Sequence, residues 1–332
     1  MITKKKEQNH TLNILKVICA ILIVFNHCVF PNEFGKIIKD ISRIAVPIFF
    51  IISGYFSYQN NENKIKNKFK RIFLMFVGAC IFWFLFTIIR YAIISPIEIK
   101  YYLKSFIDLK RIFHFFIFND NIFWGHLWFF NALLYCYGIN FIKQHFKFKI
   151  NYATESIIAI ALILGYFLLN KFIVDDNYSN AYFIRNFLFV GLPFYLIGKN
   201  IHHFNINKYF KKNCLLIILL FISFILLFVE RNFYASEIYI STLFESTFLF
   251  IFCLNNPNMN NKTIEYIGNN LNLYIYIFHP AIKYIILDVI EKLNINNITI
   301  MYIYPVIALL FTTLFSYFIY KFNNFISTIK KH

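Results

Sequence analysis

Two polar residues in the first apolar segment of the chain have side chains suited to catalysis. Lys16 and His27 lie within residues 12–30, whose length is close to the roughly 20 residues that cross a bilayer. A charged side chain inside a membrane costs about 3 kcal/mol unless it faces protein or water. An imidazole exchanges protons near neutral pH and is a common general base. The pair is therefore a candidate site.

The spacing between Lys16 and His27 places both side chains on one face of a helix. They are 11 residues apart, which is about 16 Å along a helix axis, and 11 steps of about 100° end about 20° from three full turns. One helix face thus offers a cation near one membrane surface and a base near the other.

The composition is that of a multi-pass membrane protein. Of 332 residues, 59% are hydrophobic and 21% aromatic. The net charge of +17 would suggest nucleic acid binding in a soluble protein, but the cations lie in short loops between apolar runs, as in the positive-inside pattern. We expect the lipid bilayer as partner and no nucleic acid.

The six cysteines lie in or beside apolar segments without metal-ligand spacing, so we expect buried thiols and no metal.

Apolar segments recur ten times, which predicts an all-α bundle of about ten transmembrane helices in a single membrane domain, residues 1–332. The segments are 12–30, 42–58, 72–94, 124–142, 155–172, 182–199, 212–230, 237–254, 265–289 and 298–320. An even number puts both termini on one side. The loops on that side hold roughly twice the Lys and Arg of the others, including Lys4 to Lys6, Lys149, Lys330 and Lys331, which favours cytoplasmic termini. The first segment lacks a small-residue cleavage site, so we expect it to be retained.

Several motifs, in order, resemble those of the membrane acyltransferase 3 family. Lys16, ten further residues and His27 resemble its Arg/Lys-x10-His motif. The motifs that follow are PIFFIISGYF (Pro47–Phe56), KFKRI (Lys68–Ile72), HLWFFNALL (His126–Leu134), RNFLFVGLPFYLIG (Arg185–Gly198) and NNLNLYIYIFHP (Asn269–Pro280). The resemblance covers essentially the whole chain. It departs from the family pattern at Lys16, where Arg is commoner, and at Lys68, which replaces the first Arg of an Arg-x-x-Arg pair completed by Arg71. Lysine keeps the charge but lacks the bidentate fork of arginine.

The resemblance implies an acyltransferase in which His27 is catalytic. The acyl group, usually acetyl, would come from cytoplasmic acyl-CoA, with acetyl-CoA as co-substrate. It would go to a hydroxyl of an extracytoplasmic glycan, an O-acetylation of cell-envelope polysaccharide at the bacterial plasma membrane. We expect the stand-alone form, without an exported Ser-His-Asp domain, and a homo-oligomer is compatible with the sequence. The main alternative is an exporter or flippase of a polysaccharide or lipid-linked sugar, with charges lining its path. No inverted repeat supports that alternative.

The donor is expected at the loop that enters the third apolar segment. Lys68 and Arg71 are predicted to bind the phosphates of acyl-CoA, because cations neutralise a polyanion. The alternative is that these charges serve topology alone. Lys64 and Lys66 resemble a solvated loop.

Five further residues are predicted to bind substrate, each with a structural alternative. Ser53 and Tyr55 flank Gly54, which allows close approach by a ligand or by another helix. His126 opens an outer helix end beside Trp128, a predicted interfacial anchor, and is expected to supplement His27 or bind the acceptor. Arg185, also outer, is expected to hold the acceptor or pair with an acid. His279 precedes Pro280, which frees a backbone carbonyl, so a structural polar contact is the alternative.

Glu245 is the second predicted catalytic residue. It lies in the middle of an apolar segment, where a carboxylate must be paired, protonated or hydrated. It is predicted to orient or charge His27, and the alternative is a salt bridge to Arg90 or Lys283. Two other features are left open. The outer stretch Pro96–Phe123 is either an amphipathic interfacial helix or a lid over an anionic substrate, and His202 and His203 are expected to be solvated.

Overall fold

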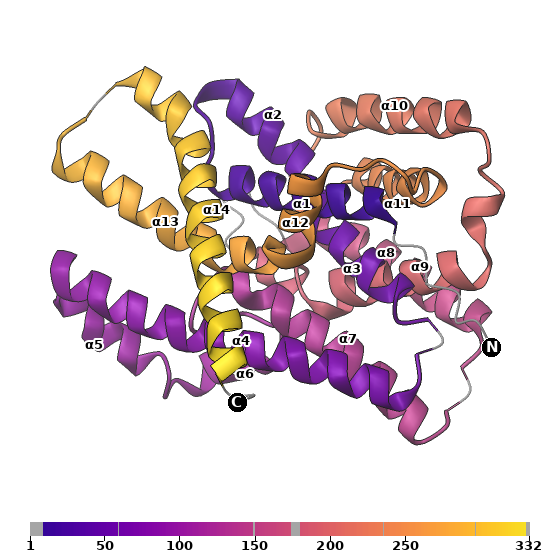
Figure 1. Cartoon of the computed structure of the whole chain (residues 1–332), viewed down its shortest axis with the longest axis horizontal. Coiled ribbons are helices and arrows are strands. Elements are labelled where there is room, and N and C mark those ends of the chain that lie inside the picture. The colour runs from indigo at the N-terminus through magenta and orange to yellow at the C-terminus, as the bar shows by residue number, and fades with distance from the viewer. Residues whose placement is uncertain are drawn as a thin grey trace. The chain divides into compact units, whose positions relative to one another are not determined.

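The computed structural model describes residues 9–58, 60–148, 150–173, 180–234, 236–295 and 297–329. These residues form helices and no β-strand, which confirms the all-α prediction (Figure 1). Some of the cations used to predict the orientation lie outside the described residues, namely Lys4 to Lys6, Lys149, Lys330 and Lys331. The chain forms two compact units. The first comprises Met1–Phe49, Asn207–Asn232 and Ile238–His332, and the second comprises Phe50–Ile206 and Phe233–Glu237.

The helices agree closely with the predicted apolar segments. The first unit contains α1 (His10–His27), α2 (Asn32–Ser42), the start of α3 (Ala45–Tyr55), α10 (Asn213–Glu230), α11 (Ile240–Asn255), α12 (Lys262–Asn270), α13 (Asn272–Lys292) and α14 (Ile298–Ile329). The second contains the rest of α3, α4 (Glu62–Ile94), α5 (Ile97–Lys104), α6 (Leu109–Ile117), α7 (Trp128–His145), α8 (Tyr152–Ile173) and α9 (Leu192–His203), with short turns at Gly125–Leu127, Ala181–Phe183 and Phe187–Gly191.

Six helices in the described part of the chain are long and apolar enough to cross a membrane, namely α1, α4, α8, α10, α13 and α14, and α11 is a shorter apolar helix. The expectation of a multi-pass membrane protein is thereby supported, whereas the number of about ten spans stays a prediction. Two predicted segments are wrong in detail. Residues 265–289 are not one helix, because the chain breaks at Leu271 between α12 and α13. Residues 182–199 are not one helix either, because residues 184–186 are not helical and α9 begins only at Leu192.

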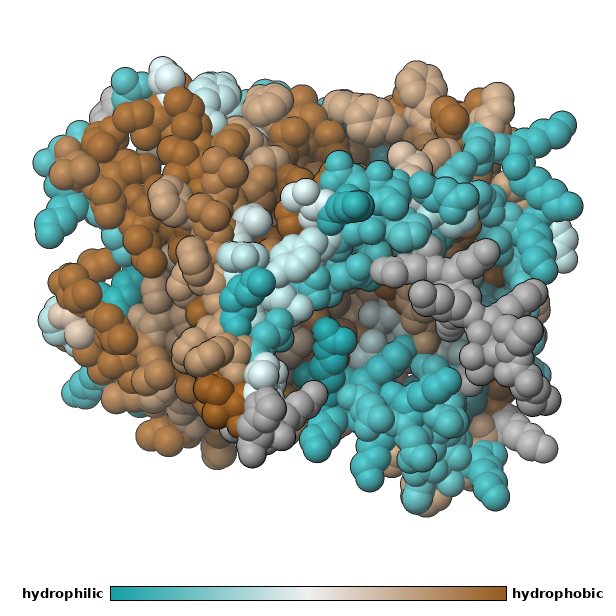
Figure 2. All heavy atoms as spheres, viewed as in Figure 1, coloured by the Kyte–Doolittle hydropathy of each residue, from teal (hydrophilic) through white to brown (hydrophobic). Residues whose placement is uncertain are grey.

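Large apolar side chains lie exposed on several helices. On α4, Leu74, Ile81, Leu85 and Ile89 are each more than half exposed and recur at helical spacing. Figure 2 shows a similar broad apolar surface over α13 and α14. Such an apolar face would be unfavourable in water, so these are the surfaces expected to face lipid.

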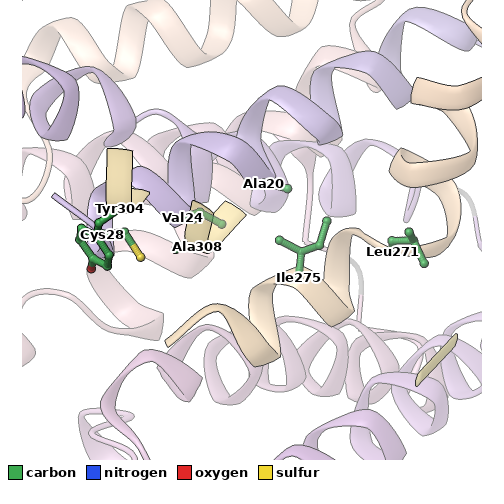
Figure 3. Close-up of a cluster of buried hydrophobic side chains, with 7 residues drawn as sticks. All are labelled: Ala20, Val24, Cys28, Leu271, Ile275, Tyr304 and Ala308. Atoms are coloured by element: carbon green, nitrogen blue, oxygen red, sulfur yellow. The ribbon is translucent and has the colours of Figure 1, made fainter. Parts of the chain in front are cut away.

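In the first unit, α1 packs against α2 and against helices that come from the other end of the chain. It runs antiparallel to α11, and the His10 backbone N–H donates to Pro257 O at 2.9 Å. Its other side packs on α12 so closely that a Cβ on Gly268 would lie 2.2 Å from Asn13 O. Further along, a buried apolar cluster joins α1 to the α13 region and α14 (Figure 3); its members are Ala20, Val24, Cys28, Leu271, Ile275, Tyr304 and Ala308.

In the second unit, α4 and α7 run antiparallel. Phe76 and Phe130 have ring centroids 6.2 Å apart, and a Cβ on Gly138 would lie 3.9 Å from the Phe69 ring. The two contacts fix the register of this pair. The N-terminal end of α4 therefore lies beside the C-terminal end of α7.

Glycines on α3 and α9 let these two helices touch. A Cβ on Gly54 would lie 1.9 Å from Tyr195 O, and a Cβ on Gly198 would lie 2.0 Å from Ile51 O. The contact is reciprocal, because each glycine faces a backbone carbonyl of the other helix. Small residues allow such backbone approach between membrane helices. The predicted role of Gly54 is thus helix packing.

A buried carboxylate joins α7, α8 and α9. Glu155 accepts from Lys143 Nζ at 2.6 Å and from Lys199 Nζ at 2.8 Å, and both Glu155 and Lys199 are buried. Glu155→Gln is expected to lower stability by about 3–5 kcal/mol, because it leaves buried lysine charge without its counter-ion. Thermal unfolding of the detergent-purified protein, followed by thiol labelling of the buried cysteines, should show a lower midpoint.

The exposed residue Glu98 on α5 provides the control for this substitution. Glu98→Gln removes the same charge from the surface and should leave the unfolding midpoint within error. Equal midpoints for the Glu155→Gln variant and the unmodified protein would show that the buried triad does not stabilise the second unit.

Candidate functional site

In the first unit, His27 and His279 lie against each other. Their ring centroids are 4.9 Å apart, with the ring planes tilted by 44°. His27 is the last residue of α1 and is half-buried, whereas His279 is in the interior of α13 and fully buried. Two predicted site residues from opposite ends of the sequence are therefore neighbours, and the second imidazole restricts where the first can turn.

The orientation of His279 follows from the proline after it. Pro280 has no N–H, so the carbonyl of Tyr276 loses its helical partner. The His279 ring is hydrogen-bonded to the carbonyl of Ile275, with Nδ1 3.1 Å from the oxygen, and interacts with that of Tyr276 as well. Because a carbonyl only accepts, Nδ1 carries the proton in this arrangement. The predicted structural polar contact is present, and it holds the ring that faces His27.

Further polar groups surround this pair. Lys283, one helical turn after His279, is close enough to interact electrostatically with both His279 and Cys28. The Cys28 thiol hydrogen-bonds with the hydroxyl of Tyr304 on α14. Lys283 is thus a site candidate that the sequence suggested only as an ion-pair partner. In the sequence, Lys283 lies four residues after His279, which places both side chains on one helix face. This spacing was the available indication that Lys283 belongs to the site.

Lys16 lies on the same continuous helix as His27, as predicted. Its Nζ donates to Asn13 Oδ1 at 3.0 Å, and Asn13 is buried. This contact orients the ammonium of Lys16 along α1. Ala20 of the apolar cluster is one turn further on, so the face that carries Lys16 and His27 borders the packed core of the first unit.

Glu245 lies on α11, which packs against α1 in the first unit. The thiols of Cys19 on α1 and Cys253 on α11 are close enough to interact electrostatically. Glu245 is buried, its Oε1 has no hydrogen-bond partner among the described residues, and no ion pair there joins it to Lys283.

At one end of the second unit, Lys68 and Arg71 face the end of α3. Lys68 Nζ donates to Phe56 O at 2.6 Å and lies 3.5 Å from Ser57 Oγ, so it caps the carbonyl end of that helix. Arg71 is close enough to Tyr137 of α7 to interact electrostatically, and Ser53 hydrogen-bonds to the same tyrosine. Tyr137 therefore links a predicted donor-binding residue to a predicted substrate-binding residue, and the sequence motifs gave no indication of it.

Two histidines at this end are not simply solvated, contrary to expectation. His202 stacks on Tyr55 with centroids 4.4 Å apart, and its Nδ1 is 2.9 Å from Tyr55 O. His203 stacks on Tyr152 at 3.6 Å and interacts with the Tyr58 hydroxyl at 3.0 Å. The aromatic rings cover part of each imidazole, and both histidines are only partly exposed. Tyr55, predicted to bind substrate, is thus part of an aromatic stack.

The opposite end of the second unit carries His126 and Arg185. His126 is buried, with its ring centroid 5.1 Å from that of Trp83. Arg185 Nη1 is 3.5 Å from Glu237 Oε1. This arginine therefore pairs with an acid, which was one of the two roles predicted for it. Arg185 also lies over the ring of Trp128, 6.0 Å from the centroid. Trp128 is buried, which contradicts its predicted role as an exposed interfacial anchor.

The predicted binding residues of the second unit lie toward two ends of α4. Arg71 and Trp83 lie on the same helix, 12 residues or about 18 Å apart along its axis. Lys68 and Arg71 are at the end near α3, whereas His126 is beside Trp83. Ser53 and Tyr55, which are predicted to bind substrate, lie at the end that carries Lys68 and Arg71, so the predicted substrate-binding residues occupy both ends of this unit.

The chain is similar to a known protein family and to a curated protein. A family model described as an acyltransferase domain matches residues 9–321. A curated protein from Enterococcus faecalis named "Amino-acid racemase" is 23% identical over 315 residues. The match covers 85% of this chain and 42% of the relative, so the chain spans less than half the length of that protein. No solved structure matches the chain.

Proposed function

Since this chain belongs to the acyltransferase 3 family, we propose that it is a membrane O-acetyltransferase of the cell envelope. It moves an acetyl group from cytoplasmic acetyl-CoA to a hydroxyl of an extracytoplasmic glycan, a cell-surface polysaccharide or its lipid-linked precursor. The proposed location is the bacterial plasma membrane, crossed by about ten helices with both termini in the cytoplasm. The observation that carries the proposal is the contact between the His27 and His279 rings at 4.9 Å.

His27 is the proposed general base. Its imidazole takes the proton of the acceptor hydroxyl as the oxygen attacks the thioester carbonyl. The carbon–sulfur bond breaks, the acetyl ester forms, and the proton passes to the departing CoA thiolate. His279, fixed by the Ile275 carbonyl, orients the His27 ring. The carboxyl group of Glu245, on α11 of the same unit, is the proposed second participant in this proton transfer.

The donor is proposed to bind at the α3 end of the second unit. Lys68 and Arg71 would attract the phosphates of acetyl-CoA. For Lys16, in the first unit, an acyl-CoA-binding role is proposed from the motif that it shares with His27. Substrate-binding roles are proposed for Ser53, Tyr55, His126 and Arg185 in the second unit and for His279 in the first. A route in which the acetyl group is first carried by a protein residue is the second candidate mechanism.

The direct test is CoA release by purified protein in liposomes supplied with acetyl-CoA. A thiol-reactive dye measures free CoA as the thioester is consumed. Acetyl-CoA-dependent release supports the acetyltransferase. Transport of a labelled glycan without acetyl-CoA and without CoA release would instead support the alternative exporter or flippase.

Substitution of the donor-binding cations should weaken acetyl-CoA binding. The Lys68→Ala, Arg71→Ala double variant is expected to raise the KM for acetyl-CoA roughly tenfold or more, because each charge-assisted hydrogen bond contributes about 1.5–3 kcal/mol. Initial rates of CoA release across a range of acetyl-CoA concentrations provide the measurement.

Lys66 is the matched control for the donor-binding substitutions. It is an exposed lysine of α4, two residues before Lys68, so Lys66→Ala should leave the KM for acetyl-CoA nearly unchanged. A similar rise in KM for this control would indicate that general positive charge, not a defined phosphate site, attracts the donor.

A further inference from the structure

A cavity of about 610 Å³ lies at the end of the second unit that is remote from Lys68 and Arg71. Its walls come from the end of α4, from α5 and α6, from the loop before α7 and from Tyr182. The volume falls within the range of about 300–1,000 Å³ that is usual for small-molecule sites. None of the residues predicted to bind substrate lines it, so its lining adds residues that those predictions did not include.

The loop that forms one wall is held in place by asparagines. Asn121 is buried, and its Oδ1 accepts from the backbone N–H groups of Phe123 at 2.9 Å and Trp124 at 3.3 Å. Its Nδ2 donates to Asn131 of α7 at 3.3 Å. Asn119 adopts a left-handed φ of 61°, and its side chain accepts from Phe187 N at 2.7 Å. The wall is therefore preformed, which lowers the entropic cost of binding a ligand.

Aromatic rings form rigid surfaces in this cavity. Trp124 stacks on Trp83 of α4, with centroids 4.7 Å apart and planes only 18° from parallel. Across the cavity, His114 and Tyr182 have centroids 5.1 Å apart. Tyrosine and tryptophan offer a flat apolar face together with a polar edge. Such surfaces suit the apolar C–H face of a sugar ring, whose edge carries hydroxyl groups.

The charged groups that line the cavity balance one another. Two carboxylates, Asp108 and Asp120, are present with two cations, Lys110 and Arg111. The predicted alternative of a lid over an anionic substrate requires an excess of positive charge, which the lining lacks. Carboxylates accept from hydroxyl groups and guanidinium groups donate to them, so a balanced lining favours an uncharged ligand rich in hydroxyls.

We propose that this cavity binds a neutral glycan and is the extended acceptor site of the proposed acetyltransferase. The inference rests on the proposed function for its biological role, but the binding itself does not depend on acetyl transfer. Trp124 and Tyr182 would stack on sugar rings, while Asp120 and Arg111 would hydrogen-bond to their hydroxyls.

The test is binding of purified protein in lipid nanodiscs to an array of immobilised oligosaccharides. The array contains neutral oligomers of glucose, galactose, rhamnose and N-acetylglucosamine, and acidic oligomers of uronic acids. We expect retention on neutral oligomers. Asp120→Asn and Arg111→Gln, two substitutions that remove a charge and keep a polar side chain at partly or fully exposed positions, should each weaken binding of the best-retained oligomer at least tenfold. Tyr101→Phe is the control, because Tyr101 is 61% exposed on α5 and does not line the cavity.

The possible outcomes separate this inference from the proposed function. Retention on neutral glycans that depends on Asp120 and Arg111 supports the cavity even if CoA release is absent. No retention, retention only on uronic acids, or equal binding by all variants overturns it, even if acetyl-CoA is consumed. Competition by glycerophosphoethanolamine but not by free oligosaccharide would also overturn it, since the cavity would then bind a lipid head group.

Discussion

His27→Ala is expected to reduce CoA release by roughly 100- to 10,000-fold, the contribution typical of a positioned general base. The hydroxyl of an unactivated alcohol is a weak nucleophile, and His27 is the imidazole on the face of α1 that also carries Lys16. With alanine at this position, no group replaces the proton acceptor beside His279. The KM for acetyl-CoA should change little, because the donor phosphates are proposed to bind at Lys68 and Arg71. Steady-state rates in liposomes measure both constants.

An exposed histidine on α7 is the matched control for this substitution. His145 has a side chain that is 53% exposed and pairs with Glu62 at 3.1 Å. His145→Ala should retain nearly full activity. An active His27→Ala protein with an unchanged kcat would remove His27 from the mechanism and would favour the relay through another residue. Thermal unfolding midpoints of both variants establish that folding is intact.

Gly54→Ala and Gly198→Ala are each expected to destabilise the second unit by at least about 3 kcal/mol, the upper part of the range for overpacked sites. A single methyl group would overlap Tyr195 O in one variant and Ile51 O in the other. Backbone atoms cannot rotate away as a side chain can, so α3 and α9 would have to separate along their contact. Loss of folded protein on size-exclusion chromatography, or a strongly lowered unfolding midpoint, is the expected observation.

Gly78 offers a control within the same unit. A Cβ at this position on α4 meets nothing within 4 Å, and alanine is also the better helix former by about 1 kcal/mol. Gly78→Ala should therefore leave the protein as stable as before or slightly more stable. If all three glycine variants unfold alike, the close contact between α3 and α9 is not what stabilises this unit.

Much of the helical framework follows from the sequence because it depends on local properties. The length of an apolar run and the 3.6-residue period decide where a membrane helix can form and which side chains share its face. For this reason, the all-α class, the position of α1 and the common face of Lys16 and His27 were all predictable. The pairing of Arg185 with an acid was also foreseen as one of two outcomes, from the placement of an arginine at an outer helix end.

Other features depend on residues that are distant in the sequence and become neighbours only when the helices pack. The contact of His27 with His279, the link through Tyr137 and the aromatic partners of His202 and His203 are of this kind. The break at Leu271 is tertiary as well, because α12 must turn to lay Gly268 against the backbone of Asn13. Periodicity determines which side chains share a face of each helix. Which faces pack against each other depends on side-chain shape and burial across the whole chain, so only the folded structure shows it.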